Sequence, residues 1–148
     1  MKFVILFIAL FLSIGSFAQN QNLRQELDQA EKSKKAAEAF MKKLQNTSAK
    51  TASIDGYTAM THFILARETS NPFTRMKHFR EGKELLEKTI KQEPNQLEWR
   101  FYRYMVQDGA PAMLGYKDQL STDLQFIRNN ISKADADLQK RIKQNIKL

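Results

Sequence analysis

The chain has 148 residues, and 24 Lys and Arg against 16 Asp and Glu give it a formal charge of +8. It contains no cysteine, which excludes disulfides, thiolate metal sites, cysteine nucleophiles and lipid attachment through cysteine. The basic residues are spread along the chain. They predict either attraction to anionic lipid, polysaccharide or acidic partners, or a solvated basic surface without a ligand.

The first 18 residues predict a secretory signal peptide. Lys2 forms a short positive region, residues 3–12 are apolar, and Ser16 and Ala18 supply small side chains before a cleavage site. The apolar run is shorter than the roughly 20 residues of a spanning helix. We therefore expect cleavage after Ala18, no transmembrane anchor after processing, and a periplasmic or secreted protein; a retained anchor is the alternative. Without Lys2 the charge is +7, and about 130 residues remain for one domain.

The mature chain predicts an all-α fold, because apolar residues recur at three and four positions and only three prolines and five glycines interrupt the sequence. A first helix is expected over 21–45, with mostly polar early turns. We expect residues 19–52 to form this helix and a linker, partly mobile, and residues 53–148 to form a domain of helical hairpins.

Two further helices are predicted next in the chain. The helix over 54–68 has Ser53 as its candidate cap and apolar residues around most of its circumference, which indicates burial on more than one side. Asn71 and Pro72 predict the cap and first residue of a helix over 72–92. Its inward residues are expected to be Met76, Phe79, Gly82, Leu86, Thr89 and Ile90, and its outer face to pair Glu84 with Lys88 and Glu87 with Lys91.

The last three helices are expected over 96–108, over 117–129 and from Ser132 onward. Asn95 and Glu98 resemble a capping box for the first of them, and Ser132 is the candidate cap of the last. Between the helices over 96–108 and 117–129, the stretch "GAPAMLGY" predicts turns. Connections this short favour antiparallel neighbours.

The helix over 96–108 divides into two apolar faces and one polar strip when its residues are placed at 100° intervals. One face holds Leu97, Phe101, Tyr104 and Met105, and the other holds Trp99, Tyr102 and Val106. Arg100, Arg103 and Gln107 occupy the strip between them. This arrangement predicts a central packing helix and not a ladder of aromatic platforms for nucleic acid.

The segment "GKELLEKTIKQEPNQLEWRF" resembles the end of a tetratricopeptide repeat, with Gly82, Leu86, Thr89 and Pro94 at its small, large, small and proline positions. Residues 54–131 are also similar to a group of small exported bacterial proteins of unknown function. These resemblances imply a short array of two stacked hairpins with the first and last helices as flanking additions, and they imply no activity.

No spacing in the sequence indicates catalytic, cofactor-binding or metal-binding residues. His62 and His78 fall on different predicted helices, and neither has a second histidine four residues away, as a zinc pair requires. Asp55, Asp118 and Asp123 are not brought together by their spacing. The sequence therefore predicts a protein without catalytic activity.

The hypothesis for a ligand groove rests on Arg100, Arg103 and Gln107, with Tyr102 or Tyr116 at its edge, because guanidinium groups fit a carboxylate. Internal ion pairs to carboxylates such as Glu84 or Asp123 are the alternative.

The favoured function is a binding or scaffolding module of the cell envelope that recognises a peptide, a protein or an acidic ligand between hairpins. An enzyme or small-molecule binder with a dispersed site, and a structural partner of an anionic surface, remain open.

Overall fold

The computed structural model describes residues 19–148, and this part of the chain is helical without a strand, which confirms the predicted all-α fold. The predicted signal peptide, residues 1–18, lies outside the described residues. No described helix is both long enough and apolar enough to cross a membrane. A helical segment over 19–30 comes first. It is followed by α2 (Lys34–Asn46), α3 (Ala52–Glu68), α4 (Pro72–Gln92), α5 (Leu97–Gly109), α6 (Leu120–Asn130) and α7 (Ala136–Asn145), with short 3₁₀ turns η1 (Ala112–Leu114) and η2 (Ile131–Lys133).

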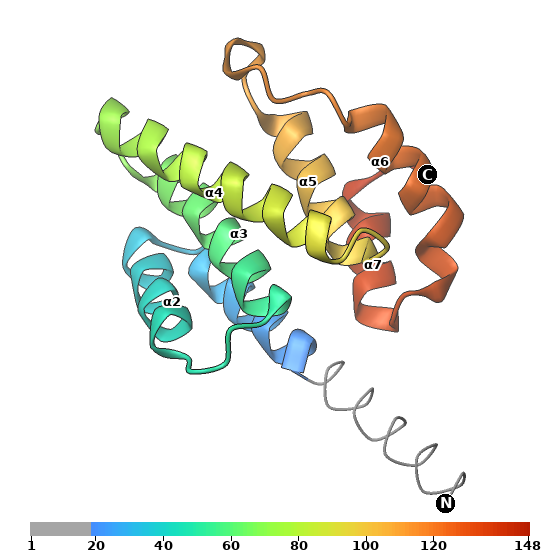
Figure 1. The fold of residues 1–148 in the computed structure, drawn as a ribbon, viewed down its shortest axis with the longest axis horizontal. Helices are drawn as coiled ribbons and strands as arrows, with labels where there is room; N and C mark the ends of the chain where they lie inside the picture. Colours follow the sequence, from blue (N-terminus) through green and yellow to red (C-terminus); the bar gives the residue numbers. More distant parts are fainter. Residues whose placement is uncertain (1–18) are drawn as a thin grey trace, which may run out of the picture.

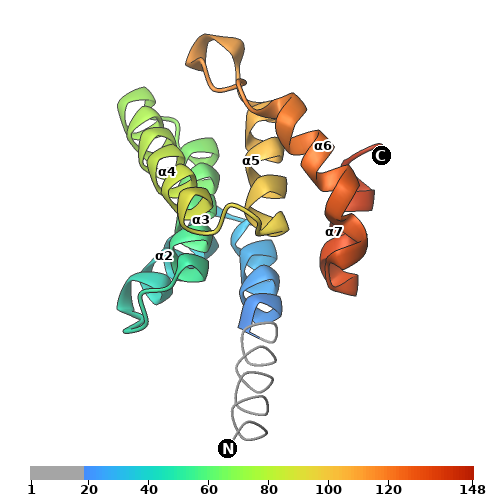
Figure 2. The same cartoon turned by 45° about the vertical axis from the view of Figure 1, so that its right-hand side comes forward.

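The helices form antiparallel hairpins packed side by side (Figure 1). α4 runs back along α3, and α2 packs on α3 as well, while α6 packs mainly on α5. Both views place the helical segment 19–30 between α2 and α7 (Figure 2). The beginning and the end of the described chain therefore meet beside α5.

The predicted helix over 21–45 is in fact two helices, because the chain turns at residues 31–33. Ser33 caps α2 by accepting a hydrogen bond from the Ala36 N–H at 3.1 Å, which starts a new helix there. Both pieces are anchored in the same core as the rest of the chain by buried residues, namely Leu23, Leu27, Ala30, Ala37, Phe40, Met41 and Leu44.

Three predicted caps are wrong, and one is confirmed. Asn71 caps α4 and Pro72 is its first residue, as predicted. Thr51, not Ser53, caps α3, and Asp135, not Ser132, caps α7. No side chain caps α5, since Gln96 occupies its cap position without a hydrogen bond and the Glu98 carboxylate is buried elsewhere.

The α3–α4 hairpin packs closely at Gly82. A Cβ atom at this glycine would lie 3.0 Å from the Ala59 carbonyl oxygen and 3.2 Å from the Phe63 ring. Leu86 and Thr89 are buried on the same face, as predicted. Met76 was expected there but is exposed, because it lies about 120° around the helix from Gly82. The tetratricopeptide-like arrangement stays a prediction.

Helix α5 is the centre of the fold, as its projection predicted. Trp99 is fully buried, and its ring would lie 2.6–2.8 Å from a Cβ at Gly56 of α3, so only glycine fits there without a shift. Tyr57 of α3 packs edge-on against Trp99, with ring centroids 5.5 Å apart. The indole N–H donates to Glu93 at 2.7 Å, which fixes the ring in the core.

Candidate functional site

The five residues of the predicted groove lie near one another around α5, but four of them are buried: Tyr102, Arg103, Gln107 and Tyr116. Arg100 is partly buried. The polar strip of α5 is therefore directed at α4 and α6 and not at solvent. What its groups bind inside the protein decides whether they are available to a ligand.

Arg103 is held by two carboxylates. It donates to both oxygens of Asp123, at 2.6 and 2.8 Å, and to Glu87 at 2.8 Å. Burial alone would lower the pKa of Arg103, but the hydrogen bonds to Asp123 hold it above its ordinary value. Arg100 approaches Asp123 at 3.2 Å and lies over the Phe126 ring. Asp123, which has no exposed surface, is thereby neutralised from two sides.

Gln107 and Tyr116 complete this arrangement. The Gln107 amide donates to Asp118 at 3.2 Å and accepts from the Gln119 N–H at 3.0 Å, which ties the end of α5 to the start of α6. The Tyr116 hydroxyl donates to Glu87 at 2.6 Å. Burial and the Glu87 carboxylate raise the pKa of Tyr116, so it stays neutral. We call Arg100, Arg103, Glu87, Asp123 and Tyr116 the Arg103 cluster.

The Arg103 cluster accounts for these polar groups without a ligand. The alternative interpretation was that the arginines form internal ion pairs with carboxylates such as Glu84 or Asp123. Asp123 does pair with Arg103, but Glu84 is exposed, and the second carboxylate bonded to Arg103 is Glu87. Glu87 thus does not form the expected pair with Lys91, and Lys88 pairs with Asp55 at 3.0 Å instead of Glu84. The ligand-groove role of the strip stays a prediction.

A second buried cluster joins the two ends of the described chain, and sequence reasoning missed it. Arg24 donates to both oxygens of Glu98 at 2.8 Å, to both oxygens of Asp135 at 2.9 and 3.0 Å, and to Asp137 at 3.3 Å. The Tyr57 hydroxyl also donates to Glu98. An arginine between Leu23 and Leu27 signals a buried ion pair, but nothing in the sequence names a partner 74 or 111 residues away.

Arg141 extends this second cluster to the surface. It donates to Asp28 of the segment 19–30 at 2.7 and 2.9 Å and, within α7, to Asp137 at 2.8 Å. The segment 19–30 is therefore attached to α7 through both Arg24 and Arg141. Burial would lower the pKa of Arg24, yet its bonds to Glu98 and Asp135 raise it. We call Arg24, Glu98, Asp135, Arg141 and Tyr57 the Arg24 cluster. Both clusters hold helices together.

Like the Nε atom of Arg100, the Tyr102 hydroxyl is buried without a hydrogen-bond partner among the described residues. Burial, followed by the nearby Glu98 charge, raises its pKa well above the ordinary value. The group is neutral and packed in the aromatic core beside Tyr57 and Trp99. It lies in the interior and not at the edge of a groove.

An exposed strip of apolar and basic side chains lies on α4. Phe73 is 85% exposed and Met76 is 48% exposed. Residues 73, 76 and 80 are three and four apart and so lie on one side of the helix, which adds the exposed Arg80 to the strip. Large apolar side chains gathered on a surface indicate a contact site more often than single ones do.

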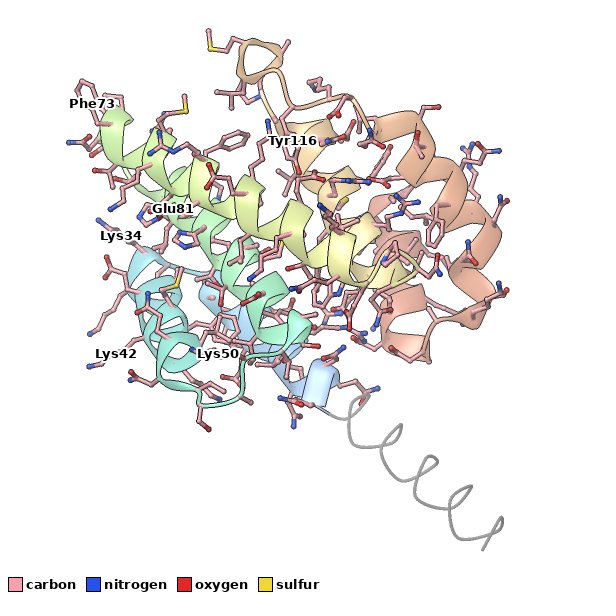
Figure 3. All side chains as sticks on the ribbon, in the orientation of Figure 1. Lys34, Lys42, Lys50, Phe73, Glu81 and Tyr116 are labelled. Carbon is pink, nitrogen blue, oxygen red and sulfur yellow. The ribbon has the colours of Figure 1, made fainter. Side chains whose placement is uncertain are left out.

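The loop between α5 and α6 borders this strip. Its Tyr116 packs against Phe79 of α4 at 6.0 Å between centroids, with Lys83 over the same ring at 4.8 Å. Met113, 90% exposed, lies three residues before Tyr116. Figure 3 shows Phe73 at the outer end of α4 and Tyr116 between α4 and the loop. We call Phe73, Met76, Arg80 and Met113 the α4 strip.

The two histidines, which fall on different helices as predicted, lie together. The Nδ1 atoms of His62 on α3 and His78 on α4 are 2.9 Å apart, beside Glu81. The three aspartates, in contrast, have separate neighbours: Lys88 for Asp55, Gln107 for Asp118 and Arg103 for Asp123.

Comparison with known proteins found no match among family models, curated proteins or solved structures.

Proposed function

We propose that the protein is an exported, non-enzymatic binding module of the cell envelope whose α4 strip receives an acidic segment of another protein. The observation that carries this is the exposure of Phe73, Met76 and Met113 beside cationic side chains. Three of the four large apolar side chains that are exposed in the described chain belong to α4 or to the loop beside it.

The charge of the strip favours an acidic partner. Arg80 lies among the apolar residues and Lys83 lies one turn further along, next to Tyr116. The chain as a whole carries +8, so a partner with carboxylates would also be attracted over a longer distance. Apolar side chains would supply most of the affinity and the cations would fix the direction of the segment.

The shape of the region suits a helical or extended peptide. Phe73, Met76 and Arg80 form a ridge along one side of α4, against which the apolar side of such a peptide can lie. The loop that carries Met113 contacts α4 through Tyr116, which packs against Phe79. The Tyr116 hydroxyl also donates to Glu87 and so attaches this loop to α4.

A displayed peptide library selected against the protein tests this proposal. We expect enriched peptides to combine Asp or Glu with large apolar residues, and the double variant Phe73→Ser, Met76→Ser to bind them about tenfold or more weakly. Leu148→Ser is the matched control, because Leu148 is 49% exposed, as Met76 is, and lies in another region. Equal binding by all three proteins, or no enrichment, would overturn the proposal.

Two further measurements place the binding in context. Vesicles of anionic lipid should bind the wild type no better than the double variant. If the protein bound these vesicles and added salt removed that binding, a charged surface would be indicated as the partner instead. Sequencing the N-terminus of the protein isolated from a cell-envelope fraction should give Gln19, the residue after the expected cleavage site.

A further inference from the structure

Three side chains that bind metals readily meet across the α3–α4 interface. His62 comes from α3, and His78 and Glu81 come from α4. The two Nδ1 atoms are 2.9 Å apart, His62 Nδ1 lies 3.4 Å from Glu81 Oε2, and His78 Nδ1 lies 4.0 Å from the same oxygen. The three ligand atoms therefore converge on one point.

The packing of the hairpin explains why they converge. A Cβ atom at Gly82 would lie 3.2 Å from the His62 Cβ, so the lack of a side chain there brings α3 against α4 at this level. His78 and Glu81 are three residues apart and share a side of α4 next to this contact. At 100° per residue, His78 and Glu81 lie about 140° and 80° around α4 from Phe73, on another side than the α4 strip. Figure 3 labels Glu81 on the α3–α4 hairpin.

The separations fit a metal ion. A point equidistant from the three atoms lies about 2.0 Å from each, given the sides of 2.9, 3.4 and 4.0 Å. Zinc bonds to histidine nitrogen measure about 2.0–2.1 Å, and those to carboxylate oxygen about 2.0–2.2 Å. The other oxygen of Glu81 faces Lys77 at 4.0 Å, which leaves Oε2 directed at the histidines.

The surroundings suit an ion with one open side. The side chains of His62, His78 and Glu81 are 15%, 22% and 39% exposed, so water can reach the point between them. Burial, followed by the charges of His78 and Lys77, lowers the pKa of His62 although Glu81 raises it, which favours the neutral imidazole that a metal needs.

We propose that His62, His78 and Glu81 bind one divalent transition-metal ion of the Zn²⁺ class, with water completing the coordination, and so tie α3 to α4. Two imidazoles with one carboxylate favour such an ion over Mg²⁺ or Ca²⁺, which prefer oxygen ligands alone. Binding needs both Nδ1 lone pairs, so whichever imidazole carries its proton on Nδ1 must shift it to Nε2. The proposal is independent of the peptide surface on another side of α4.

Titration of the untagged protein with Zn²⁺, followed by calorimetry, tests the proposal. His62 and His78 are the two histidines of the chain and there is no cysteine, so other strong ligands do not interfere. We expect one ion per chain. His62→Gln and His78→Gln should abolish this binding. Glu81→Gln should weaken it about tenfold or more, since even the loss of groups behind the ligands has such an effect.

Glu84→Gln is the matched control, because Glu84 is an exposed carboxylate one turn further along α4. It should bind Zn²⁺ as the wild type does. Circular dichroism without metal checks that each variant is folded. Unchanged Zn²⁺ binding by folded histidine variants would overturn the proposal, as would one ion shared between two chains.

A second measurement on the wild type alone keeps the proposal open to test if the variants fold poorly. Co²⁺ should give the visible absorption of a nitrogen and oxygen site, and Zn²⁺ should remove it. Zn²⁺ should also protect both histidines from acylation by diethylpyrocarbonate. Absence of the Co²⁺ absorption together with unprotected histidines in excess Zn²⁺ would overturn the proposal.

Discussion

The two arginine clusters of the interior have the same chemistry but different reach along the chain. Arg103 bonds to residues 16 and 20 positions away, on the helices before and after its own. Arg24 bonds to Glu98 and Asp135, 74 and 111 positions away. The first cluster is an attachment within one part of the fold, and the second closes the described chain into one body.

Because the two clusters join different parts of the chain, we expect the Arg103 cluster to stabilise one region and the Arg24 cluster to make the whole described chain unfold together. Loosening the Arg103 cluster releases α6 from α5, whereas loosening the Arg24 cluster releases the segment 19–30 and α7 together. A buried ion pair gives little net stability relative to an apolar pair, but losing one partner leaves an unpaired charge. Removing single carboxylates therefore tests which cluster holds more of the fold.

Glu98→Ala is expected to have the largest effect. Arg24 is 2% exposed and would lose the carboxylate that it meets on α5, while the Tyr57 hydroxyl would keep only the Asn20 carbonyl oxygen, at 3.1 Å, as an acceptor. We expect a loss of about 3–5 kcal/mol in the free energy of unfolding by urea, with faster hydrogen exchange over both 19–30 and α7.

Glu84→Ala is the control for Glu98→Ala, since Glu84 is exposed and should change stability by no more than about 0.5 kcal/mol. A loss confined to α5, with unchanged exchange in the two terminal segments, would contradict the closing role of the Arg24 cluster.

Asp123→Ala should destabilise by less, about 3 kcal/mol. In each variant the buried arginine keeps another carboxylate, Arg24 with Asp135 and Arg103 with Glu87. Removing Asp123, however, takes no bond from a buried tyrosine, and Arg100 reaches partly to solvent. Faster exchange should be confined to α6 and the end of α5. If the segment 19–30 lost protection equally, the two clusters would form one cooperative unit and the comparison would be wrong.

The tyrosines of the two clusters give a smaller contrast. Tyr57→Phe removes a bond to Glu98, which is 1% exposed, whereas Tyr116→Phe removes one to Glu87, whose side chain is 38% exposed and can accept from water instead. We expect losses of about 2 kcal/mol and about 1 kcal/mol respectively, from the range for bonds to charged groups. Urea unfolding of both variants checks the order, and equal losses would contradict it.

Much of the fold could be predicted because helices, breaks and packing faces are local signals. Asn71 and Pro72 fixed the start of α4, and the burial of Leu86 and Thr89 followed from their spacing. The break at Ser33 was not predicted because Leu23, Leu27, Ala37 and Met41 continue one apolar stripe through it. A capping residue is a weak signal inside such a stripe.

The sites could be predicted only where partners are near in sequence. Asp123 was named as a possible partner of Arg103, but Arg24 was not connected to Glu98 because tertiary contacts decide that pair. His62 and His78 were considered but not paired with each other, since a hairpin, and not the spacing of four within one helix, brings them together. The exposed Met76 was misplaced because α4 is covered on fewer sides than its apolar pattern indicates.

The smallest expected effect on stability concerns Asp135, which both pairs with Arg24 and caps α7. A substitution at this residue can separate the contribution of its charge from that of its cap. Burial raises the pKa of Asp135, but the Arg24 hydrogen bond and the Leu138 N–H outweigh it and lower the pKa below its ordinary 3.8. The unfolded state therefore takes up a proton first as the pH falls. The contribution of this carboxylate is present above pH 3.8 and is lost as the pH falls through the folded value.

Asp135→Asn keeps an oxygen that caps α7 through the Leu138 N–H, and it removes the charge together with the second acceptor of Arg24. We expect the variant to be less stable than the wild type at neutral pH and the two urea midpoints to converge as the pH falls below 3.8. Equal urea midpoints for the two proteins at every pH would mean that Asp135 acts through its cap alone. Arg24 would then depend on Glu98 for its charge balance, and the link between the two ends of the described chain would run through α5.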